Sequence, residues 1–154
     1  MPIRPEQKWY YPIDWPQLSA VVRFDRAKGR CERCRRPHGR RVFHLGDGRW
    51  FDVDLDSWRD GRGRLLRRLP PPGQLVFPQG RLVDLAGETP IPMTRVFVSC
   101  AHLDHDPGNN APRNLAALCQ RCHLEHDRPE HQRVRWWTMF LRRARGDLFN
   151  GEYR

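Results

Sequence analysis

Residues 100–123 read Cys-Ala-His-Leu-Asp-His-Asp-Pro-Gly-Asn-Asn-Ala-Pro-Arg-Asn-Leu-Ala-Ala-Leu-Cys-Gln-Arg-Cys-His. The stretch closes on a Cys-x-x-Cys pair, and a second such pair, Cys-Glu-Arg-Cys, occupies residues 31–34. Each pair can direct two thiolates at one metal ion, and two pairs complete a tetrahedral four-sulfur site. Zinc is the expected ion because it prefers soft thiolates and four ligands. We therefore predict a structural zinc held by Cys31, Cys34, Cys119 and Cys122.

The cysteine count supports metal ligation over disulfide bonding. Five cysteines is an odd number, and no export signal accompanies them, so a disulfide framework is not expected. The alternatives to zinc are a redox pair or free thiols, but a redox Cys-x-x-Cys usually occurs only once in a chain. The remaining cysteine, Cys100, is expected to be a small buried apolar residue at the end of a strand.

The quoted stretch resembles the HNH (His-Asn-His) nucleases of the ββα-metal class. In that class a strand ends at a catalytic histidine, and a loop leads to an Asn-Leu-x-x-Leu-Cys-x-x-Cys-His segment whose last histidine begins a helix. The resemblance covers residues 96–127 together with Cys31 and Cys34. It implies an α+β fold: a ββα-metal (HNH, or His-Me finger) core with a structural zinc site, an inserted β-hairpin region and flanking helices.

The chain length of 154 residues suits one domain, and we expect a single HNH endonuclease domain over residues 1–154. Its expected parts are an N-terminal arm and helix (1–30), the first zinc half and the β insertion (31–95), the ββα-metal motif (96–128), and a basic C-terminal helix and tail (129–154).

The resemblance implies metal-assisted hydrolysis of DNA phosphodiester bonds. A histidine would act as general base on water, and one divalent ion, Mg²⁺ or another, would stabilise charge on the phosphate and the leaving oxygen. His123 is the expected metal ligand, and Asn114 is expected to orient the loop or the base. Since His123 and Asp127 are four residues apart, they share one helix face and can chelate together. His126 either approaches the metal or lies on the helix surface.

The identity of the base depends on the register of the loop. Counted back from Asn114 without gaps, His102 is the base, but the residue before it is Ala101, where the family normally has an Asp or His ligand. In the first interpretation, which we favour, His102 is the base and the missing ligand is Asp104, His105, Asp106 or Asp127. In the second, Asp104 and His105 form the ligand–base pair and the loop is three residues shorter.

Charge and hydropathy indicate a polyanionic partner. The chain has 28 Lys and Arg against 18 Asp and Glu, a formal net charge of +10, and all but Lys8 and Lys28 of its basic residues are arginines. Such a balance favours nucleic acid, and arginine favours bidentate phosphate contacts. No apolar run reaches the ~18–20 residues of a membrane span, and the first residues lack the apolar core of a secretory signal. We therefore expect a cytoplasmic DNA-binding protein with no membrane partner.

Local patterns predict the remaining elements. Pro16 and Gly29 bracket a helix over 16–28, with Leu18, Val21 and Val22 facing inward. Gly46-Asp47-Gly48 joins the two strands of a hairpin within 40–56. Residues 59–73 are expected to be a loop, followed by short strands at 74–77 and 81–85. Further predictions are a strand at 94–100, a polar loop at 101–114, a short apolar segment at 115–118 and a helix that stops before Pro129.

A last helix is predicted from Pro129 to about Arg145, ended by Gly146. Val134, Trp137, Leu141 and Ala144 would form one apolar stripe along it. Basic side chains on its other faces suit phosphate contacts, which position DNA without reading its sequence. The predicted DNA-binding residues are Arg133, Arg135, Arg142 and Arg143.

Two functions follow from these observations. The first is a metal-dependent HNH endonuclease that cleaves DNA. The second, which Ala101 supports, is a non-catalytic, zinc-stabilised DNA-binding or adaptor module derived from an HNH fold.

Overall fold

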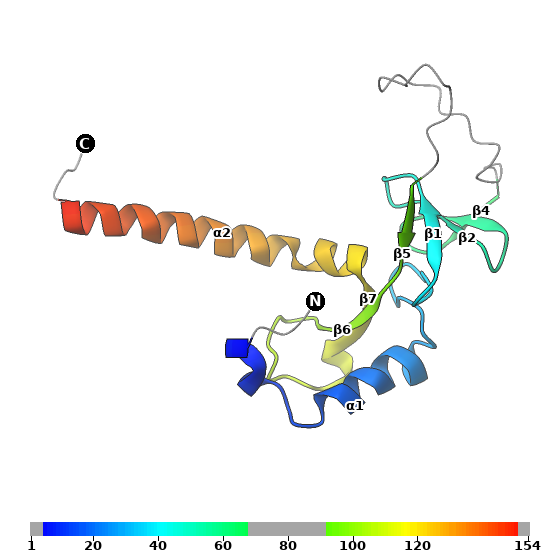
Figure 1. Cartoon of the computed structure of the whole chain (residues 1–154), viewed down its shortest axis with the longest axis horizontal. Helices are drawn as coiled ribbons and strands as arrows, with labels where there is room; N and C mark the ends of the chain where they lie inside the picture. The colour runs from blue at the N-terminus through cyan, green and yellow to red at the C-terminus, as the bar shows by residue number, and fades with distance from the viewer. Residues whose placement is uncertain (1–4, 68–91, 151–154) are drawn as a thin grey trace, which may run out of the picture.

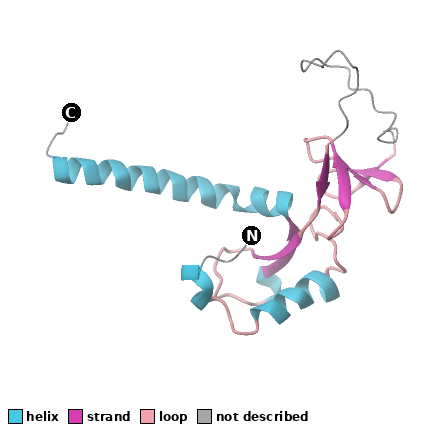
Figure 2. Cartoon of the chain, viewed as in Figure 1, coloured by secondary structure: helices cyan, strands magenta, loops and turns pink. Residues whose placement is uncertain are grey.

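The computed structural model describes residues 5–67 and 92–150. They form a mixed α+β fold with two antiparallel sheets, one of five strands in the order β4-β3-β2-β1-β5 and one of two strands, β6-β7 (Figure 1, Figure 2). The long helix α2 (Gln120–Asn150) leaves the end of β7 and projects away from the rest of the molecule (Figure 1). No helix in this part of the chain combines the length and the apolar character that crossing a bilayer requires.

Helical segments form the N-terminal part of the molecule. A 3₁₀ helix, η1 (Pro5–Tyr10), precedes α1 (Trp15–Ala20), which continues directly into the π-helical turn η2 (Val21–Arg26). The helix predicted over 16–28 is therefore confirmed, and Gly29 follows it with a left-handed φ of 66°. Val22 is buried as expected, but Val21 is half exposed, so its predicted inward position is wrong.

The predicted hairpin is confirmed and extended. β1 (Arg41–His44) pairs antiparallel with β2 (Trp50–Asp52), and β2 pairs in turn with β3 (Ser57–Arg59) and β3 with β4 (Leu65–Leu66). The loop predicted over 59–73 is wrong in its first part. The carboxylate of Asp60 accepts the main-chain N–H groups of Arg62 and Arg64, which closes a second tight turn. The strands predicted at 74–77 and 81–85 lie outside the described residues.

The single strand predicted over 94–100 is wrong, because two strands of different sheets occupy this segment. β5 (Met93–Arg95) pairs with β1, whereas β6 (Val98–His102) pairs with β7 (Leu115–Cys119). The change of sheet occurs at Val96, whose N–H donates to Arg40 O at 2.8 Å and whose carbonyl accepts the N–H of Gly39 at 2.7 Å. These bonds join the point where the chain enters the five-stranded sheet, before β1, to the point where it leaves the sheet, after β5.

The pairing of β6 with β7 also corrects the start of the predicted loop. Ala101 lies opposite Ala116 and His102 opposite Leu115, so the loop begins after His102 and contains the short 3₁₀ helix η4 (Pro112–Asn114). The apolar segment predicted at 115–118 is the strand β7, and all five of its residues are buried. β6, β7 and α2 thus follow one another as strand, strand and helix.

The C-terminal half of the chain forms one helix instead of the two predicted. Pro129 lies inside α2, and the helix runs past Gly146 to Asn150. A proline removes one main-chain donor, but restarting a helix would incur the cost of nucleation a second time. Continuation through Pro129 avoids that second nucleation.

The main core is small and joins the two sheets to η2. Its largest members are Trp50, Leu115 and Leu118, and the four paired cysteines belong to it. A separate cluster of Phe51 and Trp58 lies within the five-stranded sheet. Because the apolar core is limited, a metal ion bound by the cysteines would add much to the stability.

Leu115→Ala tests the packing of β7. Leu115 is 2% exposed, so its truncation will lower the free energy of unfolding by about 2–5 kcal/mol through lost burial and a residual cavity. Urea denaturation followed by circular dichroism measures this change. Leu124→Ala, at a leucine 54% exposed on α2, is the control and should shift stability by less than about 0.5 kcal/mol. Equal shifts for both variants would contradict the assigned core.

Candidate metal centre and active site

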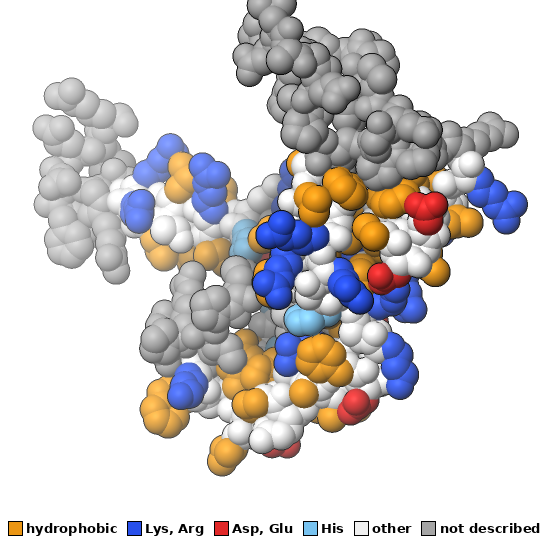
Figure 3. Space-filling model, turned by 45° about the vertical axis from the view of Figure 1, so that its right-hand side comes forward, with side chains coloured by type: hydrophobic (Ala, Val, Ile, Leu, Met, Phe, Trp, Pro, Cys, Tyr) orange, Lys and Arg blue, Asp and Glu red, His pale blue; other side chains and the backbone are white. Residues whose placement is uncertain are grey.

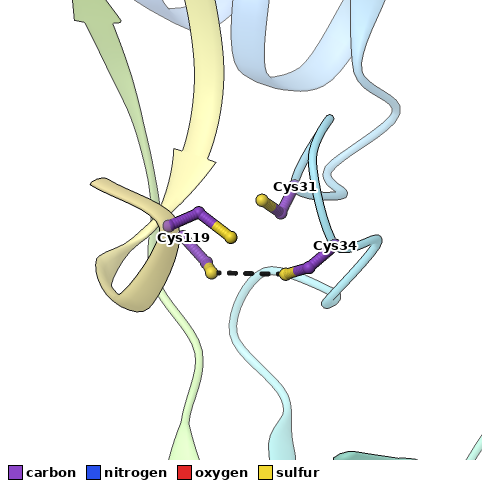
Figure 4. A group of neighbouring side chains, drawn as sticks. Cys31, Cys34 and Cys119 are labelled. Atoms are coloured by element: carbon purple, nitrogen blue, oxygen red, sulfur yellow. Dashed lines mark hydrogen bonds between the residues drawn. The ribbon is translucent and has the colours of Figure 1, made fainter. Parts of the chain in front are cut away.

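The four paired cysteines come together in one buried group. Cys31 and Cys34 lie in the loop after η2, and Cys119 and Cys122 lie at the junction of β7 with α2 (Figure 4). All four are at most 1% exposed, and their sulfur atoms lie within 4.8 Å of one another. The Sγ atoms of Cys34 and Cys119 are 3.5 Å apart (Figure 4). This group can hold a metal ion.

Hydrogen bonds fasten the first cysteine loop to β7. The N–H of Glu32 donates to Ala117 O at 2.8 Å, and the Glu32 carboxylate accepts the N–H of Ala117 at 2.8 Å. Arg26 donates two bonds of 2.9 Å to the same carboxylate. The indole N–H of Trp50 also donates to Cys34 O. These hydrogen bonds, from both main-chain and side-chain groups, therefore fix the position of the two sulfur atoms of this loop.

Close packing of the thiols changes their protonation. The pKa of Cys31 is lowered, chiefly by hydrogen bonds from Cys119 and Cys122, and the pKa of Cys119 is lowered to about 6, chiefly by a hydrogen bond from Cys122. The pKa of Cys122 is raised, chiefly by its hydrogen bond with Cys119. Part of the group is thus ready to lose protons to a soft cation. Cys100 stands apart: it is half-buried inside β6, and burial raises its pKa to about 11.

A second group of potential ligands connects the loop after β6 with α2. His105 comes from the loop and His126 and Asp127 from the helix, and their ligand atoms lie within 4.8 Å of one another. Nδ1 of His105 is 3.7 Å from a carboxylate oxygen of Asp127, and the rings of His105 and His126 stack with centroids 4.7 Å apart. The loop reaches this position with His105 in the left-handed region, at φ 63°.

Two further observations indicate that this group suits a cation. Asp127 is only 8% exposed, and its second carboxylate oxygen lies 3.3 Å from Nε2 of His123. Nε2 of His126 is buried and has no hydrogen-bond partner among the described residues. Burial lowers the pKa of His123, whose other ring nitrogen lies 3.0 Å from the Ser99 hydroxyl, so this ring favours its neutral form. Imidazoles beside a carboxylate form a typical donor set for divalent transition metals.

His102 lies in a different environment from His105. It is 9% exposed at the end of β6, and its ring stacks on Trp15 at 4.8 Å and meets Tyr11 edge-on. Its Nε2 is 3.0 Å from Oδ1 of Asn110. Since an amide oxygen only accepts, Nε2 carries a proton, and in the neutral form of the ring the lone pair lies on Nδ1. Within the described residues, His102 belongs to neither group of potential metal ligands.

Asn114 and Asp104 organise the loop between β6 and β7. Asn114 donates to the Asp104 carboxylate and to Asn109 O, each at 2.8 Å, and its side-chain oxygen accepts the N–H of Asp104 at 3.1 Å. Asn109 donates to the other carboxylate oxygen of Asp104 at 2.6 Å. These bonds occupy Asp104, which does not join His105 and Asp127 in the ligand group.

The Asn114→Ala variant tests this loop network by titration. The hydrogen bond from Asn114, with further bonds from the Asp106 N–H and Asn109, lowers the pKa of Asp104 to about 2, against about 3.9 in an unfolded chain. The network therefore stabilises the loop above about pH 4 and is lost as the pH falls towards 2. In Asn114→Ala the pKa should rise towards 3.9, as measured by carboxyl ¹³C NMR. Asn110→Ala, which removes the partner of His102, should leave it unchanged; an unchanged pKa in Asn114→Ala would contradict the network.

The predicted DNA-binding arginines lie on the exposed part of α2. Arg133 forms an ion pair with Glu130 at 2.8 Å, and Arg133, Arg135, Arg142 and Arg143 are exposed. Arg59, by contrast, is structural, because it donates to the buried carboxylate of Asp52 at 3.1 Å and to Gly63 O at 2.7 Å.

No protein-family model, curated protein or solved structure matches this chain. The contacts of the two ligand groups are therefore the basis for assigning a function.

Proposed function

We propose that this protein is a metal-dependent endonuclease of the HNH type that hydrolyses DNA phosphodiester bonds. The observation that supports this proposal most is the meeting of His105 with His126 and Asp127, whose ligand atoms lie within 4.8 Å of one another. In our proposal zinc occupies the cysteines and has a structural role, since four sulfur ligands leave no open position. The second ion, Mg²⁺ or another divalent metal, is held by His105, His126 and Asp127.

The proposed ligands account for Ala101. In the gapless register Ala101, the residue before the base His102, cannot bind a metal. In our proposal His105 from the loop and Asp127 from α2 bind the ion in its place. His123 lies 3.3 Å from Asp127 and orients this carboxylate. A bound divalent ion would supply charge stabilisation for the phosphate and the leaving oxygen.

His102 is the proposed general base. Asn110 fixes the proton on Nε2, so Nδ1 is the atom that would accept a proton from water. The stack on Trp15 holds the ring plane in one orientation. Cleavage should therefore decline at low pH, where Nδ1 is already protonated.

The charge of the molecule suits a nucleic-acid substrate. Lys and Arg side chains gather in a band across the face drawn in Figure 3, and histidine side chains lie beside them. With a formal net charge of +10, this surface would attract the phosphate backbone over a distance of about one Debye length.

The alternative function is a non-catalytic DNA-binding or adaptor module. The observation that favours it is the burial of His102 against Trp15 and Tyr11, which limits the approach of water to the ring.

Nicking of supercoiled plasmid DNA separates the two functions. Wild-type protein should convert the plasmid to open circles with Mg²⁺, Mn²⁺ or Ni²⁺, and EDTA should stop the reaction. His105→Ala, as a ligand variant, should regain part of its activity at higher metal concentration, whereas His102→Ala, as a base variant, should not. DNA binding without cleavage by any of these ions, with zinc still bound, would establish the alternative.

A further inference from the structure

The projecting part of α2 carries large apolar side chains that nothing in the described chain covers. Residues 131–143 are exposed on every side of the helix. Trp136, Trp137 and Phe140 are 62%, 53% and 49% exposed, and their rings stack on one another with centroids 5.5–5.9 Å apart. A patch of this kind on a charged chain marks an interaction site.

These side chains occupy one side of the helix. Val134, Trp137 and Leu141 recur at spacings of three and four, and Trp136 and Phe140 flank them. We define Val134, Trp136, Trp137, Phe140 and Leu141 as the apolar stripe. Arginines gather mainly along the other side of the projecting helix (Figure 3). By helical spacing Arg135 and Arg142 fall on that side, whereas Arg143, seven residues after Trp136, borders the stripe.

We propose that the apolar stripe pairs with the same stripe of a second copy of this chain. The distribution of charge favours this occupant, because Arg135 and Arg142 would point away from the partner helix and Arg143 would lie at the edge of the contact. Arg133 lies within the face of the stripe, four residues before Trp137 and seven before Phe140, and it donates two hydrogen bonds of 2.8 and 2.9 Å to Glu130. The arginine inside the contact is therefore already paired with a carboxylate of its own helix, which reduces the repulsion between two basic chains.

The spacing and the area of the stripe agree with a helix pair. Alternating steps of three and four are those of helices that pack side by side with interdigitated side chains. From the exposed fractions, the stripe offers roughly 500 Å² of apolar surface per copy. Two copies would bury about 1,000 Å², which reaches the lower limit for a specific interface. The arginine sides of both helices would remain free to meet phosphates.

Sedimentation velocity over a range of protein concentrations tests the proposal. Wild-type protein should form a dimer as the concentration rises. Trp137→Glu should raise the dimer dissociation constant by about tenfold or more, because it places a charge at the centre of the contact. Met139→Glu is the matched control: Met139 is 47% exposed on the arginine side, and its replacement should leave dimerisation almost unchanged. Circular dichroism will establish that both variants keep the helix.

Two results would overturn the proposal. One is a wild-type protein that stays monomeric throughout the concentration range, and the other is equal dimerisation of Trp137→Glu and Met139→Glu. Binding of short DNA and of anionic vesicles identifies the other possible occupants. If wild-type protein is monomeric and Trp137→Glu loses one of these two ligands, the stripe contacts that ligand instead of a second copy. This test is independent of nuclease activity.

Discussion

Replacing Cys119 with serine should abolish the binding of zinc that we expect at the four-cysteine group, and with it the cooperative unfolding transition. Cys119 is 1% exposed at the junction of β7 with α2, and its sulfur meets those of the first cysteine loop. Zinc bound by such a group contributes about 10–16 kcal/mol in small zinc-dependent folds, as much as the entire stability of an ordinary domain. With a small apolar core to replace it, the variant should be largely unfolded at room temperature.

Zinc content by mass spectrometry and thermal unfolding by circular dichroism measure this effect. Wild-type protein should carry one zinc per chain, and a strong chelator should reproduce the unfolding of the Cys119→Ser variant. Cys100→Ser is the matched control, because Cys100 lies outside the buried group. It should retain zinc and unfold cooperatively. A Cys119→Ser variant that melts like wild type would show that the four cysteines do not hold a stabilising ion.

Replacing Asp127 with asparagine will reduce plasmid cleavage by more than about 100-fold. The carboxylate lies between His105 and His123, at 3.7 and 3.3 Å, so it is the one anionic member of the proposed catalytic ligand group. Asparagine keeps the shape but removes the charge, so the affinity of the site for a divalent ion should collapse. Zinc content and helix content should not change, since the cysteines are untouched.

Glu125→Gln is the control for the Asp127→Asn variant. Glu125 lies on the same helix and pairs with Arg33 and Arg121, away from the histidines. Its conversion to an amide should leave nicking within about twofold, because exposed ion pairs contribute little. Full activity in Asp127→Asn would remove this carboxylate from the proposed mechanism. Equal loss in both variants would point to a general effect of helix charge on DNA binding.

Spacing in the sequence was sufficient to predict the four-cysteine group and the first hairpin. The two Cys-x-x-Cys pairs leave few geometric alternatives, and Gly46 and Gly48 mark a turn that requires positive φ. The division of residues 93–102 into two strands, β5 and β6, could not be predicted from sequence spacing. Its cause is the pair of bonds between Val96 and residues 39–40, which are distant in sequence. The helix boundary predicted at Pro129 was wrong for a related reason. Local sequence rules count the hydrogen bond that proline removes but not the free-energy cost of nucleating a second helix.

The candidate active site was predictable in composition but not in arrangement. His123 and Asp127 were expected to share a helix face, and they lie 3.3 Å apart. The sequence left His126 undecided, because a spacing of three from His123 also suits a surface position. The structure places it within 4.8 Å of the ligand atoms of His105 and Asp127, and within the described residues its buried Nε2 has no hydrogen-bond partner. The position of His105 depends on a left-handed φ of 63°, which no local pattern predicts for a histidine.

The meeting of Arg40 with Val96 has a consequence for how this molecule can vary. The segment from β1 to β5 begins and ends at one pair of hydrogen-bonded residues, Arg40 and Val96, and within it Val42 and Trp50 pack into the main core. The entropy lost in closing a loop grows with the logarithm of its length. The connection between β4 and β5 could therefore change in length at little cost. A short turn joining residues 40 and 96 would instead remove Trp50 from the core, together with its hydrogen bond to Cys34 O.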